Sequence, residues 1–437
     1  MPYNEWIVPK KILKSAEWVF LAGVFFLIIR NNTYPWPIKR LSDILFALSA
    51  LGILGYLCFS KEWPRLTSLL RKNAKGTILI FSGLSLATLI SFLRFGVPIN
   101  GEGILEFGRL MEAIFLVIAI GFFQSYNGNF FKKVIFAQLS TVVYAAAFFL
   151  PKSFLIAGDM GRLRLFENNP ANVAYYSFIS MTFVLVWLLA RNTSMKKRVV
   201  LSALGVLYAG TLLWTQLRGV WVGMAISIIF IIGYTAYRSF LSKGRFKYIA
   251  VASAAVLSLF LLGFTAIPSF PKDLVLLRLV DPHFVAANRF DVYTENPGVI
   301  FKTITQQKPT FYFQDPSRSY LWKEYSKRLL ESPWGFGASF YPSLTVIYNN
   351  KPLAPHNLIL EILVLGGVFM LLGFFDFFIR AYKNIFFYLR QGEFEWPLYV
   401  TAALTGFLAA AMFDNLDSFR FLWVIIGLGL NYSLLRG

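Results

Sequence analysis

The chain has 437 residues, of which 57% are hydrophobic and only 15% are charged, against about 25% charged in an ordinary soluble domain. The apolar residues stand in uninterrupted blocks, which excludes a soluble multidomain enzyme. The net charge of +20 would suggest a nucleic-acid binder if it lay on one face. The basic residues instead fall in short clusters between the apolar blocks, so we expect a lipid bilayer around the chain and no nucleic-acid partner.

Twelve segments approach or meet the roughly 20 apolar residues that a membrane helix needs. In chain order they lie near 15–30, 41–59, 76–93, 107–123, 134–150, 173–190, 199–217, 219–237, 249–267, 357–379, 397–413 and 421–435. The first is short and follows three lysines, and we interpret it as a signal anchor because no small-residue cleavage site comes after it. The predicted fold class is therefore all-α, a polytopic membrane protein with about twelve transmembrane helices.

Basic residues in the short loops predict the orientation, because cytoplasmic loops hold more Lys and Arg. With the N-terminus inside, every inner loop carries a basic cluster, at 61–75, 132–133, 191–198, 238–247 and 380–390. Arg30, Lys39 and Arg40 in the first outer loop run against this trend. We therefore expect both termini in the cytoplasm and the long connection before the tenth helix on the outer face.

This orientation divides the chain into three parts. Residues 1–267 hold the first nine helices, residues 268–356 form an outer-face cap loop, and residues 357–437 hold the last three helices. Prolines divide the cap into short pieces. Within it, Ser317 could cap an amphipathic helix that runs to about Glu331, because apolar residues recur there at helical spacing. Such a helix could lie on the outer leaflet.

The turn Thr-Gln-Leu-Arg-Gly at residues 215–219 is the sharpest candidate for a binding site. It joins two apolar stretches, so the chain must reverse there with almost no loop. Arg218 can present a planar fork of five donors to a phosphate, with Gln216 beside it and Gly219 allowing close approach of backbones. The alternative is an arginine that snorkels to the lipid headgroups.

His356 is the second candidate and one of only two histidines in the chain. Asn357 can cap the tenth membrane helix, which would hold His356 at the outer mouth of the bundle. A histidine titrates near neutrality and can take a proton from an attacking hydroxyl, although an interfacial histidine without a role is the alternative. Glu361, one turn inside this helix, could hold His356, neutralise an outer-face arginine or serve packing. Arg109 and Glu112, three residues apart in the fourth helix, could pair with each other.

No pattern indicates a cofactor. The nearest outer acidic pairs, Asp414 with Asp417 and Glu102 with Glu106, are too small for a metal ligand set. The chain has no Gly-rich phosphate loop and no nucleotide fingerprint. We therefore expect neither a metal nor a nucleotide.

The expected outer face is cationic, and a cationic site at the depth of the lipid phosphates suits a diphosphate-linked lipid. It holds His356 and five arginines: Arg162, Arg164, Arg218, Arg318 and Arg420. Three motifs follow in order along the chain, and the first is the Arg218 turn. The second is Arg318-Ser319-Tyr320-Leu321-Trp322, followed by Glu331-Ser332-Pro333-Trp334-Gly335-Phe336-Gly337. The third is His356-Asn357-Leu358-Ile359-Leu360-Glu361, which leads into Gly366-Gly367. With these motifs, mainly within 165–375, and with its twelve helices and large outer loop, the chain resembles the O-antigen ligase and O-antigen polymerase family of bacterial membrane glycosyltransferases.

The resemblance implies a GT-C-like enzyme of the bacterial inner membrane, with its active site on the periplasmic face. It implies that the arginines, Arg218 and Arg318 foremost with Arg164 and Arg420, bind the diphosphate of an undecaprenyl-linked glycan donor. His356 would assist the acceptor hydroxyl, with Gln216, Asn357 and Glu361 in support. Leu217 departs from the family pattern, which has a hydroxyl residue before the arginine. The leucine lacks that hydroxyl and with it a possible phosphate contact, whereas the guanidinium of Arg218 is kept.

The implied reaction needs no metal and no nucleotide sugar, and direct displacement at the anomeric carbon would invert its configuration. The acceptor, a lipid A-core or another lipid-linked glycan, cannot be read from the sequence. Two other functions remain open: a flippase or transporter for the same lipid, and a protein O-oligosaccharyltransferase. Against a transporter, nearly all the unusual polar residues lie in the expected outer half of the bilayer.

Overall fold

A computed structural model describes residues 7–27, 41–60, 62–96, 101–153, 170–190, 193–215, 217–241, 247–265, 267, 316–339, 346–348, 351–413 and 419–435. The helices among them are α1 (Ile7–Phe26), α2 (Leu41–Ser60), α3 (Trp63–Phe95), α4 (Gly101–Tyr126), α5 (Phe130–Ser153), α6 (Pro170–Leu189), α7 (Met195–Trp214), α8 (Arg218–Leu241), α9 (Lys247–Thr265), α13 (Pro316–Glu331), α14 (Leu358–Arg390), α15 (Glu395–Ala411) and α16 (Phe419–Leu430). Short 3-10 helices lie at Gly337–Ser339 and Tyr432–Leu435.

Each of the twelve predicted membrane segments overlaps with one of these helices, although the bounds differ; the first, predicted at 15–30, lies in a helix at Ile7–Phe26. In the part of the chain that the structure describes, eight helices, α2 to α8 and α14, are long and apolar enough to cross a membrane. The chain is therefore a helical membrane protein. Membrane crossing by α1, α9, α15 and α16 stays a prediction.

Two long helices extend further than their apolar cores predicted. The third begins at Trp63 rather than at residue 76, and the tenth continues to Arg390 rather than ending at 379. The prediction followed the apolar stretch, whereas the helices continue into polar sequence. Half-buried Asp376, near the predicted end of the tenth, pairs with Arg380 one turn later.

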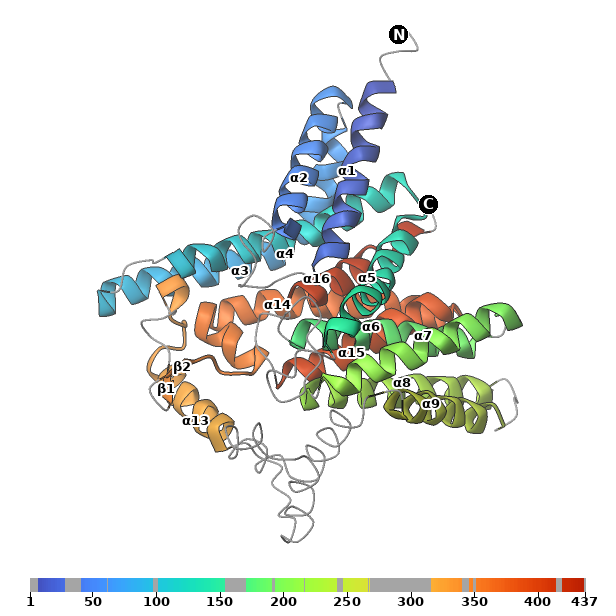
Figure 1. Ribbon diagram of the computed structural model, residues 1–437. Helices are drawn as coiled ribbons and strands as arrows, with labels where there is room; N and C mark the ends of the chain where they lie inside the picture. Colours follow the sequence, from blue (N-terminus) through green and yellow to red (C-terminus); the bar gives the residue numbers. More distant parts are fainter. Residues whose placement is uncertain are drawn as a thin grey trace.

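α3 and α14 lie side by side along the bundle (Figure 1). Small residues set how closely they approach: a Cβ on Gly83 would come within 2.6 Å of the Gly366 carbonyl oxygen, and one on Gly373 within 2.7 Å of the Gly76 carbonyl oxygen. Such close backbone packing is typical of membrane helices, where dispersion contacts replace the hydrophobic drive. This pair forms the side of the bundle on which α13 rests.

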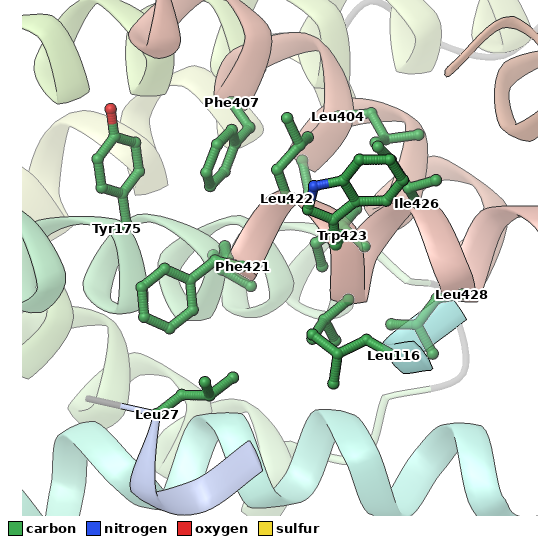
Figure 2. Close-up of a cluster of buried hydrophobic side chains, with 14 of the residues drawn as sticks. Leu27, Leu116, Tyr175, Leu404, Phe407, Phe421, Leu422, Trp423, Ile426 and Leu428 are labelled. Carbon is green, nitrogen blue, oxygen red and sulfur yellow. The ribbon is translucent and has the colours of Figure 1, made fainter. Parts of the chain in front are cut away.

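The core lies where α4, α6, α15 and α16 meet, and its side chains are mostly aromatic and branched (Figure 2). Tyr175 of α6 stacks on Phe407 of α15, with 4.8 Å between the ring centroids. Trp423 of α16 is completely buried and meets Phe377 of α14 edge to face. This core fixes α14 and α15 relative to α6 and thereby positions the ends of these helices.

α13 begins at Pro316, so Ser317 lies in its first turn and does not cap it as predicted. The fixed φ of proline suits the first position of a helix. The strands β1 (Val346–Tyr348) and β2 (Lys351–Leu353) pair antiparallel between α13 and α14. These elements lie together at the end of the bundle where α14 begins (Figure 1). Most of the predicted cap, 268–315, lies outside the described residues, so a closed cap stays a prediction.

Candidate active site

Arg218 begins α8, only four residues after α7 ends at Trp214. The hydroxyl of Thr215 donates to the Leu212 carbonyl oxygen at 2.6 Å, and the indole N–H of Trp221 reaches the same oxygen at 3.2 Å. The tight reversal predicted at this turn is therefore confirmed. Arg218 is half-buried there, while Gln216 lies outside the described residues.

The start of α8 packs closely on the end of α15. A Cβ on Gly219 would come within 2.9 Å of the Phe413 Cβ and 3.4 Å of the Ala410 carbonyl oxygen, and one on Gly223 would overlap the Gly406 carbonyl oxygen. Glycine spacing of this kind lets two membrane helices touch along their backbones. Arg218 is thereby fixed next to the turn that ends α15, residues 410–413.

Asn357 ties the start of α14 to the same turn. Its side-chain oxygen accepts from the Leu360 amide at 3.1 Å, which makes it the predicted N-cap. Its side-chain amide donates to the Met412 carbonyl oxygen at 3.1 Å. The turn at 410–413 therefore lies between the first residues of α8 and the first residues of α14, and it brings Arg218 and His356 to one end of the bundle.

His356 has a left-handed backbone, with φ of +50°, and it is the one non-glycine residue with positive φ among those the structure describes. This conformation is uncommon outside glycine and costs of order 1–3 kcal/mol unless its surroundings enforce it. Here Pro355 precedes it and the Asn357 cap follows it. Local backbone strain concentrates at functional sites, so the positive φ favours a functional role for half-buried His356.

Arg318 reaches the same place from α13. One helical turn after it, the indole N–H of Trp322 donates to the Pro355 carbonyl oxygen at 2.9 Å. At the far end of α13, the guanidinium of Arg94 donates to the Glu331 carbonyl oxygen at 2.8 Å. The helix is thus held at the residue directly before His356 and at the end of α3, and it carries a half-buried Arg318.

Glu361 is buried one turn inside α14, beneath α13. Tyr325 of α13 accepts a hydrogen bond from the Val346 amide at 3.0 Å. Burial raises the pKa of Tyr325 to about 12; the Val346 hydrogen bond and the Arg328 charge oppose this rise, and the Glu361 charge adds to it. The Glu361 carboxylate therefore lies close enough to Tyr325 to influence its pKa. The three predicted roles of Glu361 stay predictions.

Residues 332–338, which we call the wedge, follow α13 and hydrogen-bond to both α14 and α3. The Phe336 amide donates to the Val364 carbonyl oxygen at 2.6 Å, where non-helical Gly366 and Gly367 kink α14. On the other side, the Ser91 hydroxyl donates to the Phe336 carbonyl oxygen at 2.7 Å and the Ala338 amide donates to the Thr88 hydroxyl at 2.9 Å. Backbone outside a helix is tolerated at membrane depth when protein surrounds it.

Arg420 is placed differently from the other two arginines. It is buried at the start of α16, and its guanidinium forms ion pairs with Asp43 of α2 at 2.6 Å and Glu112 of α4 at 2.5 Å. Two carboxylates already balance its charge, so the geometry favours a clamp between three helices. Glu112, predicted as a partner of Arg109, makes this ion pair with a residue 308 positions away.

The remaining predicted groups lie outside the described residues: Arg162, Arg164, Asp414 and Asp417. In the ranges that the structure describes, no cluster of three or more His, Cys, Asp and Glu side chains could hold a metal ion. The contacts described above thus gather Arg218, Arg318 and His356 at one end of the bundle. Asn357 fixes the start of α14 directly after His356, and Glu361 is buried one turn further along the helix.

The O-antigen ligase family model matches residues 203–375. No curated protein matches the chain. The matched segment runs from α7 into α14 and contains Arg218, Arg318, His356, Asn357 and Glu361, whereas Arg164 and Arg420 lie outside it. The match confirms, over this segment of the chain, the resemblance to the O-antigen ligase family that the three motifs predicted.

Proposed function

We propose that the chain transfers a glycan from a polyprenyl diphosphate-linked donor to an acceptor hydroxyl at the outer leaflet. The supporting observation is the convergence of Arg218, Arg318 and His356 from three separate elements, through contacts at the 410–413 turn and at Pro355. All three lie within the segment that matches the O-antigen ligase family. Similarity to this family favours a membrane glycosyltransferase over a transporter.

The chemistry needs two things of the protein. The bond between the anomeric carbon and the diphosphate breaks as charge develops on the leaving diphosphate, and guanidinium groups fixed in a dry site stabilise that charge. Arg218 and Arg318 supply these guanidinium groups. The new bond forms from an acceptor oxygen on the opposite face of the anomeric carbon, which inverts its configuration. His356 takes the acceptor proton as that bond forms.

The backbone around these groups suits preorganisation. His356 is held between Pro355 and a capped helix, and Arg218 between a three-residue reversal and a glycine contact. Fixed groups contribute to rate because their ordering is completed during folding rather than during the reaction. In this proposal a bound metal has no role, since the arginines carry the neutralising charge.

The experiment is single-turnover transfer by the purified full-length protein in detergent, with a radiolabelled polyprenyl diphosphate-linked glycan. Three acceptors are offered separately: lipid A-core, a second polyprenyl-linked glycan and an acceptor peptide. We expect labelled product with one of them, together with release of polyprenyl diphosphate. Intact donor with all three, under conditions in which the protein moves the lipid across proteoliposomes, would replace the transferase with a transporter. Product with the peptide alone would indicate protein glycosylation.

A further inference from the structure

A groove of about 660 Å³ lies between α14 and α15, towards the end of α14 away from His356. Phe378, Ile379, Phe386 and Phe387 of α14 line one side, and Leu408 of α15 lines the other. Its volume falls within the roughly 300–1,000 Å³ of small-molecule sites. Ile379 and Phe387 are 47% and 55% exposed, so the groove opens sideways out of the bundle.

The deeper part of the groove offers nothing to a polar ligand. Its two hydroxyl side chains, Tyr382 and Thr405, hydrogen-bond to each other, and Thr405 also donates to the Thr401 carbonyl oxygen at 2.8 Å. The remaining side chains of that part are aromatic or aliphatic. A hydrocarbon chain suits such a surface, because it requires no hydrogen bonds and packs against the aromatic and aliphatic side chains.

Two basic side chains also line the groove. Lys383 lies one turn after Ile379 and Arg390 lies at the end of α14, and their spacing of seven residues places them on one face of the helix. The Arg390 guanidinium lies 5.1 Å from the centre of the Phe386 ring. Neither side chain forms an ion pair with a described residue. The groove therefore presents two positive charges beside apolar side chains, and no carboxylate among the described residues forms an ion pair with either.

The length of the groove matches one leaflet. From Phe378 to Arg390 the helix rises by about 18 Å at 1.5 Å per residue, and half of the hydrocarbon core is about 15 Å thick. Phe378 therefore lies towards the middle of the bilayer and Arg390 at its surface, with Lys383 between them. Basic pockets between membrane helices at that depth bind the headgroups of anionic lipids.

We propose that this groove binds one anionic phospholipid, with an acyl chain along Phe378 and Ile379 and the headgroup phosphate between Lys383 and Arg390. The site is separate from the cationic site at His356, because the two lie at opposite ends of α14. It is independent of the proposed glycan transfer. Binding a lipid there would fix the packing of α14 against α15, the two helices whose ends meet at Asn357.

The test is native mass spectrometry of the purified full-length protein, titrated with phosphatidylglycerol or phosphatidylcholine of the same acyl chains. We expect tighter binding of phosphatidylglycerol. The double variant Lys383→Gln/Arg390→Gln should weaken it about 10- to 30-fold, because each basic residue near the surface contributes about a factor of five in affinity to an anionic lipid. The phosphatidylcholine affinity should hardly change.

Two further variants make the result specific. Lys196→Gln/Lys197→Gln removes two exposed charges at the start of α7, at the same end of the bundle, and should leave the preference intact. Ile379→Trp keeps the charges but fills the groove and should weaken both lipids. Equal losses in the two charge variants, or unchanged binding in Ile379→Trp, would overturn the site. Undecaprenyl phosphate binding in preference to phosphatidylglycerol would overturn the choice of ligand.

Discussion

Arg218 and Arg318 are 100 positions apart, yet both reach one end of the bundle, because α8 packs on the end of α15 and α13 is bonded to Pro355. We predict that Arg218→Ala and Arg318→Ala each lower single-turnover transfer about 10- to 150-fold, since a charge-assisted hydrogen bond is worth about 1.5–3 kcal/mol. Lysine should rescue in part, because it cannot make the bidentate contact.

The matched control for these arginines is Arg238→Ala. Its guanidinium donates to the Gly392 carbonyl oxygen at the other end of α8, so its loss should leave transfer unchanged. Protein levels and thermal unfolding of all variants are measured alongside. Normal transfer by both site variants would remove Arg218 and Arg318 from the diphosphate site.

His356 is predicted to accept the proton of the acceptor hydroxyl. His356→Ala should lower the rate about 10²- to 10⁴-fold, the usual contribution of a general base, while donor binding stays nearly intact because the arginines hold the diphosphate. His356→Gln can orient a hydroxyl but cannot take its proton. Single-turnover rates and donor affinities separate the roles: near-normal turnover in the glutamine variant would mean orientation alone, and loss of donor binding would place His356 on the diphosphate.

Residue-level reasoning from the sequence succeeded where the signal was local. The Asn357 cap and the reversal before Arg218 each depend on a few neighbouring residues, and both are confirmed. The Arg420 ion pairs with Asp43 and Glu112 join residues more than 300 positions apart, and no spacing rule in one sequence could predict them. Assignment of Arg420 to the donor diphosphate stays a prediction that its two carboxylate partners disfavour.

At the scale of elements, apolar blocks predicted the positions of the helices because lipid imposes a minimum apolar length. They could not predict the kink of α14 or the wedge, which depend on three-dimensional fit. The motif Trp334-Gly335-Phe336-Gly337 was visible in the sequence only as part of the family resemblance. Its glycines are required because α3 and α14 leave room for backbone alone.

The wedge should be the element most sensitive to a small substitution. Gly337 has φ of +67°, and a Cβ there would overlap the backbone of Thr88. We predict that Gly337→Ala displaces the wedge, lowers the melting temperature in detergent and weakens transfer through α13 and its Arg318. Gly233→Ala in α8 is the control, because nothing lies within 4 Å of its added methyl group. Equal melting temperatures for the two variants would contradict the packing described here.

For the molecule as a whole, the balance of charge at the site predicts independence from metal ions. If Arg218 and Arg318 neutralise the diphosphate, the purified protein should transfer glycan at an unchanged rate in excess chelator. Asp414→Asn with Asp417→Asn should then have a mild effect. Activity that chelator abolishes and magnesium or manganese restores would assign the diphosphate charge to a metal instead.

The orientation of the whole chain is the last prediction, and it decides which leaflet the candidate site faces. Basic clusters in the inner loops place both termini in the cytoplasm and α13 on the outer face. Cys58 is the only cysteine in the chain, so Cys58→Ser gives a background in which single cysteines can be introduced. Leu330 on α13 is 85% exposed and Met195 at the start of α7 is 74% exposed. A cysteine introduced at either position is therefore accessible to a thiol reagent.

In intact spheroplasts, a membrane-impermeant maleimide should label Leu330→Cys, because α13 faces outward. It should label Met195→Cys only after lysis, because α7 begins at the opposite end of the bundle from Arg218. Labelling of both after lysis controls for access to each thiol. The reverse pattern in intact cells would place Arg218, Arg318 and His356 at the cytoplasmic leaflet, where a donor delivered to the outer leaflet could not reach them.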